Sequence, residues 1–247
     1  KFLAILIYKY YKRMKKKYSL ILPCYNEYKN LRLLIPLLHK CFYRSNYQII
    51  IVDDDSEDLT IKKLKSEFRS SKNIKYILRK KNPSLGLSIK EGIKKSKGNV
   101  IVVMDTDFNH SPKDLKKMIR LYNQDNYDLI CGSRFLKGGF STTHFRHYCS
   151  KIFNLFVNLI TRGTFTDNMS GFFIIKKSLL NKMLDKIFYG YGDFYIRLLF
   201  YMQKKELKIH EVPVIYGPRK FGQSKTKFVK ILILYSFETI KLVLKNI

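Results

Sequence analysis

The chain has 247 residues, 46% hydrophobic and 15% aromatic, which is enough apolar side chain for one sizeable core and excludes a disordered protein. Its 48 Lys and Arg residues outnumber its 19 Asp and Glu residues, and the formal charge of +29 makes nucleic acid, nucleotides and anionic membranes candidate partners. Because much of this charge is lysine interleaved with Ile, Tyr and Asn along the chain, it is weak support for any one of them.

The predicted elements alternate between strand and helix after an N-terminal segment, residues 1–17, that is apolar and then basic. That order is the reverse of a secretory signal peptide, so we predict none. Apolar runs predict strands at 18–23, 47–52, 74–78, 99–104 and 128–132, and helical spacing predicts helices at 31–43, 60–70, 88–96 and 112–123. The alternation predicts an α/β fold with a mostly parallel sheet and helices on both faces.

The last predicted element is a helix over residues 228–247, which is strongly apolar but carries three lysines and a glutamate. We expect an amphipathic helix on the protein or in a membrane interface, and an ordinary packed terminal helix is the alternative. No stretch reaches the roughly 18 uninterrupted apolar residues that a membrane-spanning helix needs. The chain therefore divides into the segment 1–17, one domain over 18–227 and the helix 228–247.

Three predicted strands end in polar clusters, at residues 23–27, 53–56 and 105–109. The carboxyl ends of parallel strands share one edge of a sheet, and open α/β sheets bind ligands at that edge. We therefore expect the three clusters to form one site.

The third cluster contains Asp105, Asp107 and Asn109 directly after a buried strand. A fully extended Asp-x-Asp would point its side chains to opposite faces, but a bend at the strand end lets both carboxylates reach one point. Oxygen ligands of this kind suit Mg²⁺ or Mn²⁺ shared with substrate phosphates. The simpler alternative is that these residues only close a strand. His110 is the one histidine near the cluster, and local hydrogen bonding is its simpler role.

Several other classes of site lack their sequence signatures. The chain has no P-loop, no Gly-x-Gly-x-x-Gly after the first strand and no Gly-x-Ser-x-Gly elbow. Its four cysteines have no paired spacing, so we expect reduced thiols and neither a disulfide framework nor a zinc site.

A series of motifs carries a family resemblance. In chain order they are Pro23-x-Tyr25-Asn26-Glu27, Asp53-Asp54-x-Ser56, Asp105-x-Asp107, Gly132-Ser133-Arg134, Ser170-Gly171-Phe172, Tyr189-Gly190-Tyr191-Gly192-Asp193-Phe194 and Pro218-Arg219-x-x-Gly222-x-Ser224-Lys225. Together, over about residues 18–227, they resemble the inverting family 2 glycosyltransferases of the GT-A fold, of the dolichol-phosphate mannosyltransferase or polyprenyl-phosphate sugar synthase type. One departure is Leu59, which stands where relatives carry glycine, so we expect a different turn there.

The resemblance implies a role for each matching residue. Nucleotide binding would fall to Pro23, Tyr25, Glu27, Val52, Asp54, Asp105 and Thr106. A Mg²⁺ or Mn²⁺ ion would be held by Asp105, Asp107 and Asn109. The acceptor phosphate would meet Arg134, Arg146, Ser150, Arg219, Ser224 and Lys225, and the catalytic residues would be Asp107, Arg134 and Arg146.

The implied reaction is transfer of one sugar from a nucleotide-sugar, with GDP-mannose favoured and a UDP-sugar as the alternative, to a polyprenyl or dolichyl phosphate. A phosphate acceptor is ionised at neutral pH and needs no strong general base, and arginine's planar fork matches a phosphate. We expect a peripheral protein on the cytoplasmic face of an anionic membrane, with a membrane-anchoring partner as a further candidate and no nucleic-acid partner.

Other functions stay open from the residues alone. A glycosyltransferase acting on a soluble glycan or protein would need a general base, for which Asp167 or Asp193 are candidates; either could instead cap a helix. A non-enzymatic nucleic-acid binder would explain the charge, but the acids clustered at strand ends would repel a phosphate backbone. A processive polysaccharide synthase is disfavoured because that branch uses a tryptophan motif and the chain has no tryptophan. A catalytically silent relative is disfavoured because every acid needed for metal and nucleotide is present.

Overall fold

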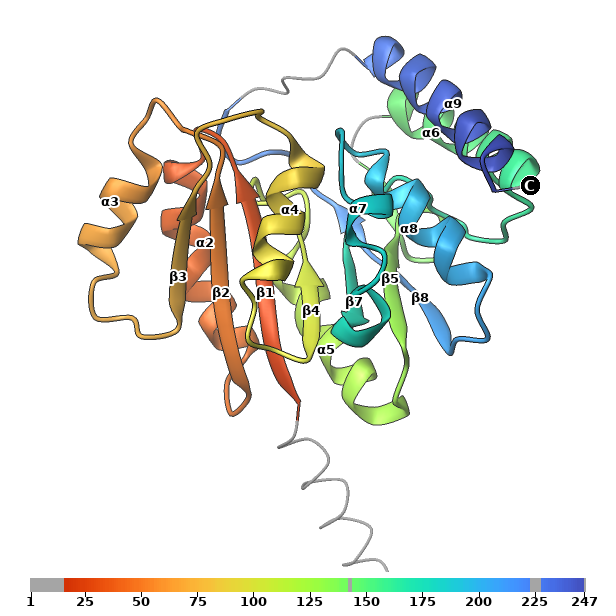
Figure 1. The fold of residues 1–247 in the computed structure, drawn as a ribbon. Helices are drawn as coiled ribbons and strands as arrows, with labels where there is room; N and C mark the ends of the chain where they lie inside the picture. The colour runs from red at the N-terminus through yellow and green to blue at the C-terminus, as the bar shows by residue number, and fades with distance from the viewer. Residues whose placement is uncertain (1–15, 142–143, 223–227, 247) are drawn as a thin grey trace, which may run out of the picture.

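The computed structural model describes residues 16–141, 144–222 and 228–246, and a seven-stranded sheet forms its centre (Figure 1). The strand order is β3-β2-β1-β4-β7-β5-β8. These strands are β1 (Lys17–Cys24), β2 (Asn46–Asp53), β3 (Ile74–Leu78), β4 (Val100–Val103), β5 (Leu129–Ser133), β7 (Phe173–Lys176) and β8 (Ile209–Pro213). The predicted strands thus all form, and the expectation of a mostly parallel sheet is confirmed.

One strand runs against the others. β7 pairs antiparallel with both β4 and β5, whereas the remaining neighbours in the sheet pair in parallel. A separate two-stranded sheet joins β6 (Phe140–Ser141) in parallel to β9 (Ile215–Tyr216). Tyr216 of β9 also forms an isolated antiparallel bridge with His110, which brings β9 beside the segment that follows β4.

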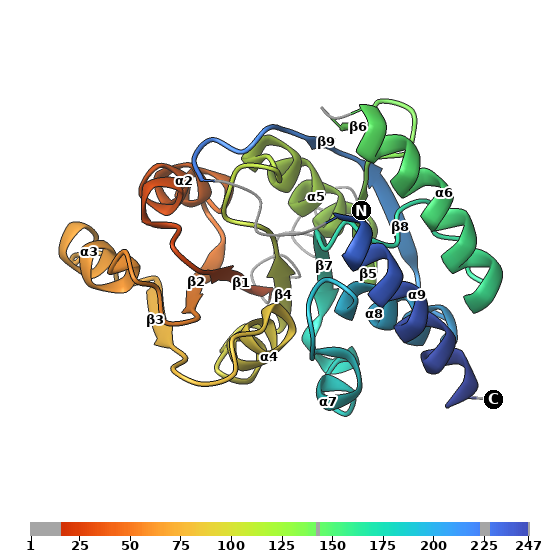
Figure 2. The ribbon, with the colours of Figure 1, turned by 90° about the horizontal axis from the view of Figure 1, so that it is seen from above.

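Helices cover both faces of the sheet, as Figures 1 and 2 show. On one face α2 (Tyr28–Cys41), α3 (Thr60–Glu67) and α5 (Pro112–Asp125) bury apolar side chains against the sheet. On the other face α4 (Leu85–Lys94), α7 (Leu184–Ile187) and α8 (Phe194–Gln203) do the same. A short 3-10 helix, η1 (Lys177–Leu179), follows β7. Two apolar layers therefore hold the strand ends in fixed positions.

Two further helices, α6 (His144–Thr161) and α9 (Phe228–Leu244), lie side by side near the carboxyl end of the sheet (Figures 1 and 2). Their shared core consists of Phe153, Val157 and Tyr235, which pack with Ile196 of α8. The predicted C-terminal helix is therefore present and packs on the protein. Residues 1–15 of the predicted N-terminal segment lie outside the described residues.

In the part of the chain that the structure describes, no helix combines the length and hydropathy needed to cross a bilayer.

The turn before α3 keeps the conformation that glycine favours. Leu59 adopts a left-handed backbone with φ of 59°, and its side chain is half exposed. A left-handed conformation brings Cβ close to the backbone and costs about 1–2 kcal/mol for a residue other than glycine. A leucine thus adopts here the left-handed backbone that glycine favours, and a turn different from that of relatives remains a prediction.

Candidate active site

The ends of β1, β2 and β4 meet at one cleft of about 930 Å³. The predicted residues that line it from these ends are Pro23, Tyr25, Glu27, Asp54, Asp105, Thr106, Asp107 and Asn109. Residues from later in the chain complete it: Arg134, Arg146, Ser150 and Arg219. The predicted convergence of these strand ends is confirmed, because residues following all three strands line one cleft.

A tight turn over residues 105–109, which we call the acid turn, follows β4 and brings the two aspartates together. Phe108 has a left-handed backbone with φ of 71°, and the N–H of Asn109 donates to Oδ1 of Asp107 at 3.0 Å. The N–H of Asp105 donates to Nδ1 of His110 at 2.9 Å. The chain therefore bends at the end of the strand as expected, and both carboxylates reach the cleft.

The surroundings of these carboxylates disfavour their charged forms. It raises the pKa of Asp105 to about 6, against the opposing attraction of Arg219 and Arg134. Burial also raises the pKa of Asp107, and the neighbouring charge of Asp105 raises it further. A cation beside the buried Asp107 and the partly exposed Asp105 would offset the repulsion between the two carboxylates.

His110 and Asn109 stabilise the acid turn by hydrogen bonds with Asp105 and Asp107. His110 is buried and stacks on Phe172 with ring centroids 4.6 Å apart. Burial lowers the pKa of His110 to about 4, so it is neutral and its local hydrogen bond is a structural one. The side-chain amide of Asn109 donates to Oδ2 of Asp107 at 3.0 Å and to the hydroxyl of Tyr216 at 2.9 Å.

Across the cleft, Arg134 is held by a buried carboxylate. Nε and Nη2 of Arg134 donate to the two oxygens of Asp167 at 2.7 and 2.8 Å, and its backbone N–H donates at 3.1 Å. Asp167 is fully buried; burial opposes its ionisation, but the charge and hydrogen bonds of Arg134 hold its pKa below the usual range. Asp167 lies between α6 and β7, so it caps no helix. The three hydrogen bonds from Arg134 make Asp167 a residue that positions that arginine.

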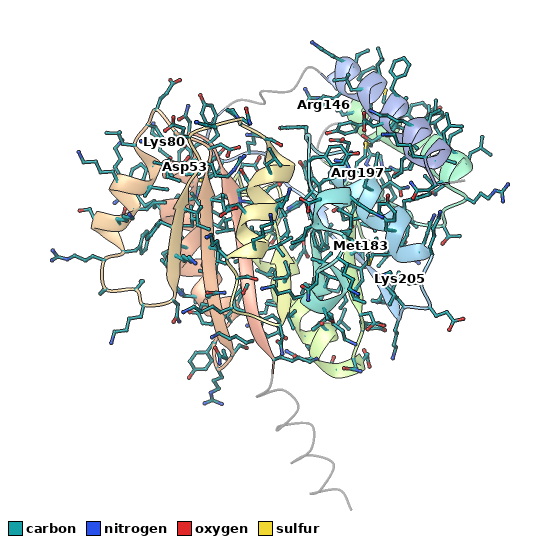
Figure 3. The ribbon with its side chains drawn as sticks, in the orientation of Figure 1. Asp53, Lys80, Arg146, Met183, Arg197 and Lys205 are labelled. Atoms are coloured by element: carbon teal, nitrogen blue, oxygen red, sulfur yellow. The ribbon has the colours of Figure 1, made fainter. Side chains whose placement is uncertain are left out.

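The first turns of α6 supply two more cleft residues. Arg146 and Ser150 are four residues apart in one helix, which places them on one face, and both line the cleft. Arg146 lies at the same end of the molecule as Asp53, the last residue of β2 (Figure 3). No helix was predicted over these residues, and Arg146 and Ser150 were named only because the family resemblance implied them.

A strap, which we define as residues 217–222, crosses the acid turn. The N–H of Gly217 donates to the carbonyl of Asn109 at 3.1 Å, and the N–H of Lys220 donates to the carbonyl of Asp107 at 3.2 Å. Between them, Nη2 of Arg219 lies 2.8 Å from Oδ2 of Asp107. The predicted residues Ser224 and Lys225 lie outside the described residues.

On the nucleotide side, Asp54 is engaged by the protein itself. It pairs with Arg79, and it accepts hydrogen bonds from the backbone N–H of Ser84 at 2.8 Å and the hydroxyl of Ser88 at 2.6 Å. These contacts fix the segment before α4 against the end of β2. Asp54 therefore shapes this wall of the cleft, whatever else it binds.

Comparison with known proteins identifies the family. Residues 19–184 match the family described as Glycosyl transferase family 2. The chain belongs to glycosyl transferase family 2. The family inferred from the sequence motifs is confirmed, and membership argues against a nucleic-acid-binding module.

Two relatives and one solved structure are similar to most of this chain. A dolichol-phosphate mannosyltransferase of Pyrococcus furiosus is 34% identical over 85% of this chain, which spans 59% of that protein's length. A dolichol-phosphate mannosyltransferase of Saccharomyces cerevisiae is 27% identical, with 90% of this chain and 85% of that protein covered. Glucosyl-3-phosphoglycerate synthase of Mycobacterium tuberculosis, crystallised with Mn²⁺ and UDP-glucose, superimposes with a TM-score of 0.70 at 15% identity, over 97% of this chain and 82% of that one. This likeness confirms the GT-A fold.

The donor set of this family 2 chain fits a hard divalent cation. Within the described ranges, no group of three or more His, Cys, Asp or Glu side chains could enclose a metal. Asp105 and Asp107 instead offer two neighbouring carboxylates, and burial raises the pKa of each. Mg²⁺ is commonly bound by one or two carboxylates with substrate phosphates completing the shell. Asn109 turns its amide nitrogen toward Asp107, so its predicted role as a ligand needs that amide to rotate.

Two sets of residues differ between prediction and structure. Val52 does not line the cleft: it is fully buried in the core beneath α4. Asp193 begins α8 but caps it with no side-chain hydrogen bond; it accepts from the N–H of Tyr191 at 2.8 Å and pairs with Arg197. The cleft residues that the sequence did not assign include Tyr191, Met169, Tyr216, Ile231 and Tyr235. Of these, only Tyr191 fell in a motif.

Proposed function

We propose that this protein is an inverting glycosyltransferase that transfers one sugar from a nucleotide-sugar, GDP-mannose in the first instance, to a polyprenyl or dolichyl phosphate. The observation that carries the proposal is the buried pair of Arg134 and Asp167. It presents a fixed guanidinium to the cleft and engages Asp167, one of the two carboxylates considered as a general base. The names of the two mannosyltransferase relatives support the same acceptor class.

The two walls of the cleft differ in charge, which suits two phosphate-bearing substrates. Asp105 and Asp107 would hold a Mg²⁺ or Mn²⁺ ion against the donor diphosphate, and that ion would stabilise the departing nucleotide. Arg134 and Arg146 would bind the acceptor phosphate, with Ser150 as a hydrogen-bond donor one turn along α6. The acceptor oxygen is already ionised at neutral pH, so the arginines need only aim it at the anomeric carbon.

An exposed apolar surface, which we call the helix platform, supports a membrane-borne acceptor. It consists of large apolar side chains that repeat along one face of α6 and α9: Phe145, Tyr148, Ile152, Leu155, Leu159, Val229, Ile233, Leu234, Phe237, Ile240 and Leu244. The same helices place Arg146, Ser150, Ile231 and Tyr235 in the cleft lining. Seated in the interface of an anionic leaflet, the platform would bring the cleft to a lipid phosphate.

A transfer assay tests the proposal. The full chain with MnCl₂ and a short polyprenyl phosphate would be incubated separately with radiolabelled GDP-mannose, UDP-glucose and UDP-N-acetylglucosamine. We expect radioactivity in the organic phase with one donor, lost on addition of EDTA and in Asp107→Asn.

The assay also decides between acceptor classes. Metal-dependent binding of a nucleotide-sugar without any lipid product would favour a soluble glycan or protein acceptor. The absence of nucleotide-sugar binding would refute a glycosyltransferase. A membrane-anchoring partner would be indicated if transfer required membranes that the purified chain does not bind.

A further inference from the structure

Arg219 of the strap places its guanidinium beside the carboxylate of Asp107 in the acid turn. Oδ2 of Asp107 accepts from Nη2 of Arg219 at 2.8 Å, and Nη1 of Arg219 lies 3.8 Å from Oε1 of Glu27. Asp107 is only 3% exposed, so this guanidinium is a direct counterion for a carboxylate that water scarcely reaches. A buried carboxylate without such a partner would be strongly destabilised.

The strap is attached to the acid turn by its backbone and not by Arg219 alone. The hydrogen bonds from Gly217 and Lys220 flank Arg219, and the amide of Asn30 in α2 donates to the carbonyl of Phe221 at 3.2 Å. Beyond these anchors, Gly222 has φ of 82° and nothing within 4 Å of its Cβ position. The backbone bonds at Gly217, Lys220 and Phe221 would therefore hold the strap in place if the side chain of Arg219 left Asp107.

We propose that Arg219 is an internal counterion that competes with the divalent cation for Asp107. Before the metal binds, the guanidinium occupies Oδ2 of Asp107 and stabilises the acid turn. When the metal takes that oxygen, the displaced guanidinium becomes available to the donor diphosphate, which lies in the same cleft under the proposed function. The inference rests on the metal site of that proposal and adds that metal binding must displace Arg219.

The competition predicts that losing Arg219 tightens metal binding. Mn²⁺ alone, without nucleotide, would be titrated into the full chain and free Mn²⁺ measured by electron paramagnetic resonance. We expect Arg219→Gln to lower the Kd for Mn²⁺ at least fivefold, and Arg219→Lys to lie between it and the unsubstituted chain.

Lys220→Gln is the matched control, because it removes one positive charge from the neighbouring strap residue, whose backbone but not side chain contacts Asp107. We expect its Kd to change less than twofold. Equal tightening in Lys220→Gln would mean a general field effect and would overturn the proposal, as would an unchanged or weaker Kd in Arg219→Gln.

Thermal unfolding gives an independent readout. Arg219→Gln should lower the Tm in EDTA and leave it unchanged in saturating Mn²⁺, since the metal then replaces the guanidinium; an equal loss of Tm in both conditions would contradict the inference. A chain that binds no Mn²⁺ at all would overturn both this inference and the proposed metal site. Mn²⁺ bound equally by both chains would overturn only the inference.

Discussion

The ion pair between Arg134 and Asp167 can be tested by replacing Asp167 with asparagine, which keeps the shape and removes the charge. Asp167 is fully buried and the side chain of Arg134 is 11% exposed, so the guanidinium would keep little water in exchange for its lost partner. Removing one member of a buried pair costs about 3–5 kcal/mol. Because asparagine retains one acceptor oxygen, we expect the low end, about 3 kcal/mol of unfolding free energy.

Urea unfolding followed by far-ultraviolet circular dichroism measures this loss, and it suits a chain without tryptophan. The control is Asp185→Asn, which breaks an ion pair with Lys90 from a side chain that is 80% exposed. We expect no measurable change in the control, because exposed pairs contribute little. A loss in Asp167→Asn no larger than that of the control would refute the assignment of Asp167 as the anchor of Arg134.

The same variant separates an orienting role from a catalytic base. Arg134 lowers the pKa of Asp167 in the folded chain. The ionised Asp167 therefore stabilises the folded chain fully above the unfolded pKa of about 4, and this contribution is lost as the pH falls through the lower folded pKa. The stability difference between Asp167→Asn and the unsubstituted chain should therefore shrink below about pH 4. If Asp167 were instead the base, activity would fall with little change in stability.

Three further outcomes are expected. Affinity for Mn²⁺ should fall as the pH drops below about 6, because Asp105 must lose a proton to bind a cation. For one proton the loss is at most about tenfold per pH unit. Isothermal titration calorimetry at pH 5, 6 and 7 measures this affinity, and an affinity that does not change with pH would contradict the prediction. Replacing Leu159 and Phe237 of the helix platform together with glutamate should weaken sedimentation with anionic vesicles at least tenfold, whereas Tyr43→Glu, equally exposed but away from the platform, should not. Leu59→Gly should raise the unfolding free energy by about 1 kcal/mol by relieving the left-handed leucine, and Leu59→Ala, which keeps Cβ, should not.

The sequence predicted the parts of the fold that depend on local pattern. The apolar runs of β1, β2 and β4 and the polar clusters after them were enough to place Glu27, Asp54 and Asp107 in one cleft. Tertiary pairing was not predictable in the same way. β7 is only four residues long and runs antiparallel between β4 and β5, and nothing in its composition distinguishes that direction.

The partners of the charged residues were also beyond sequence reasoning. Asp167 matched both a helix cap and a general base in the sequence, because each role needs only a carboxylate at a suitable position. Its partner Arg134 lies 33 residues earlier, at the end of β5, and meets it only when β7 has inserted beside that strand. Arg219 similarly meets Asp107 only because β9 turns the chain back over the acid turn.

These long-range pairs explain how so basic a chain keeps an acidic pocket. Asp105, Asp107 and Glu27 lie on one wall of the cleft, and Arg134 and Arg146 lie on the other. The strap supplies an arginine at Asp107, and Asp167 fixes Arg134 in place. A cleft whose charges are balanced by two anchored arginines can admit a metal with a diphosphate on one side and an anionic acceptor on the other. Because Asp167 already accepts from Nε and Nη2 of Arg134, the anionic acceptor of the proposed function would have to meet the remaining edge of that guanidinium, together with Arg146.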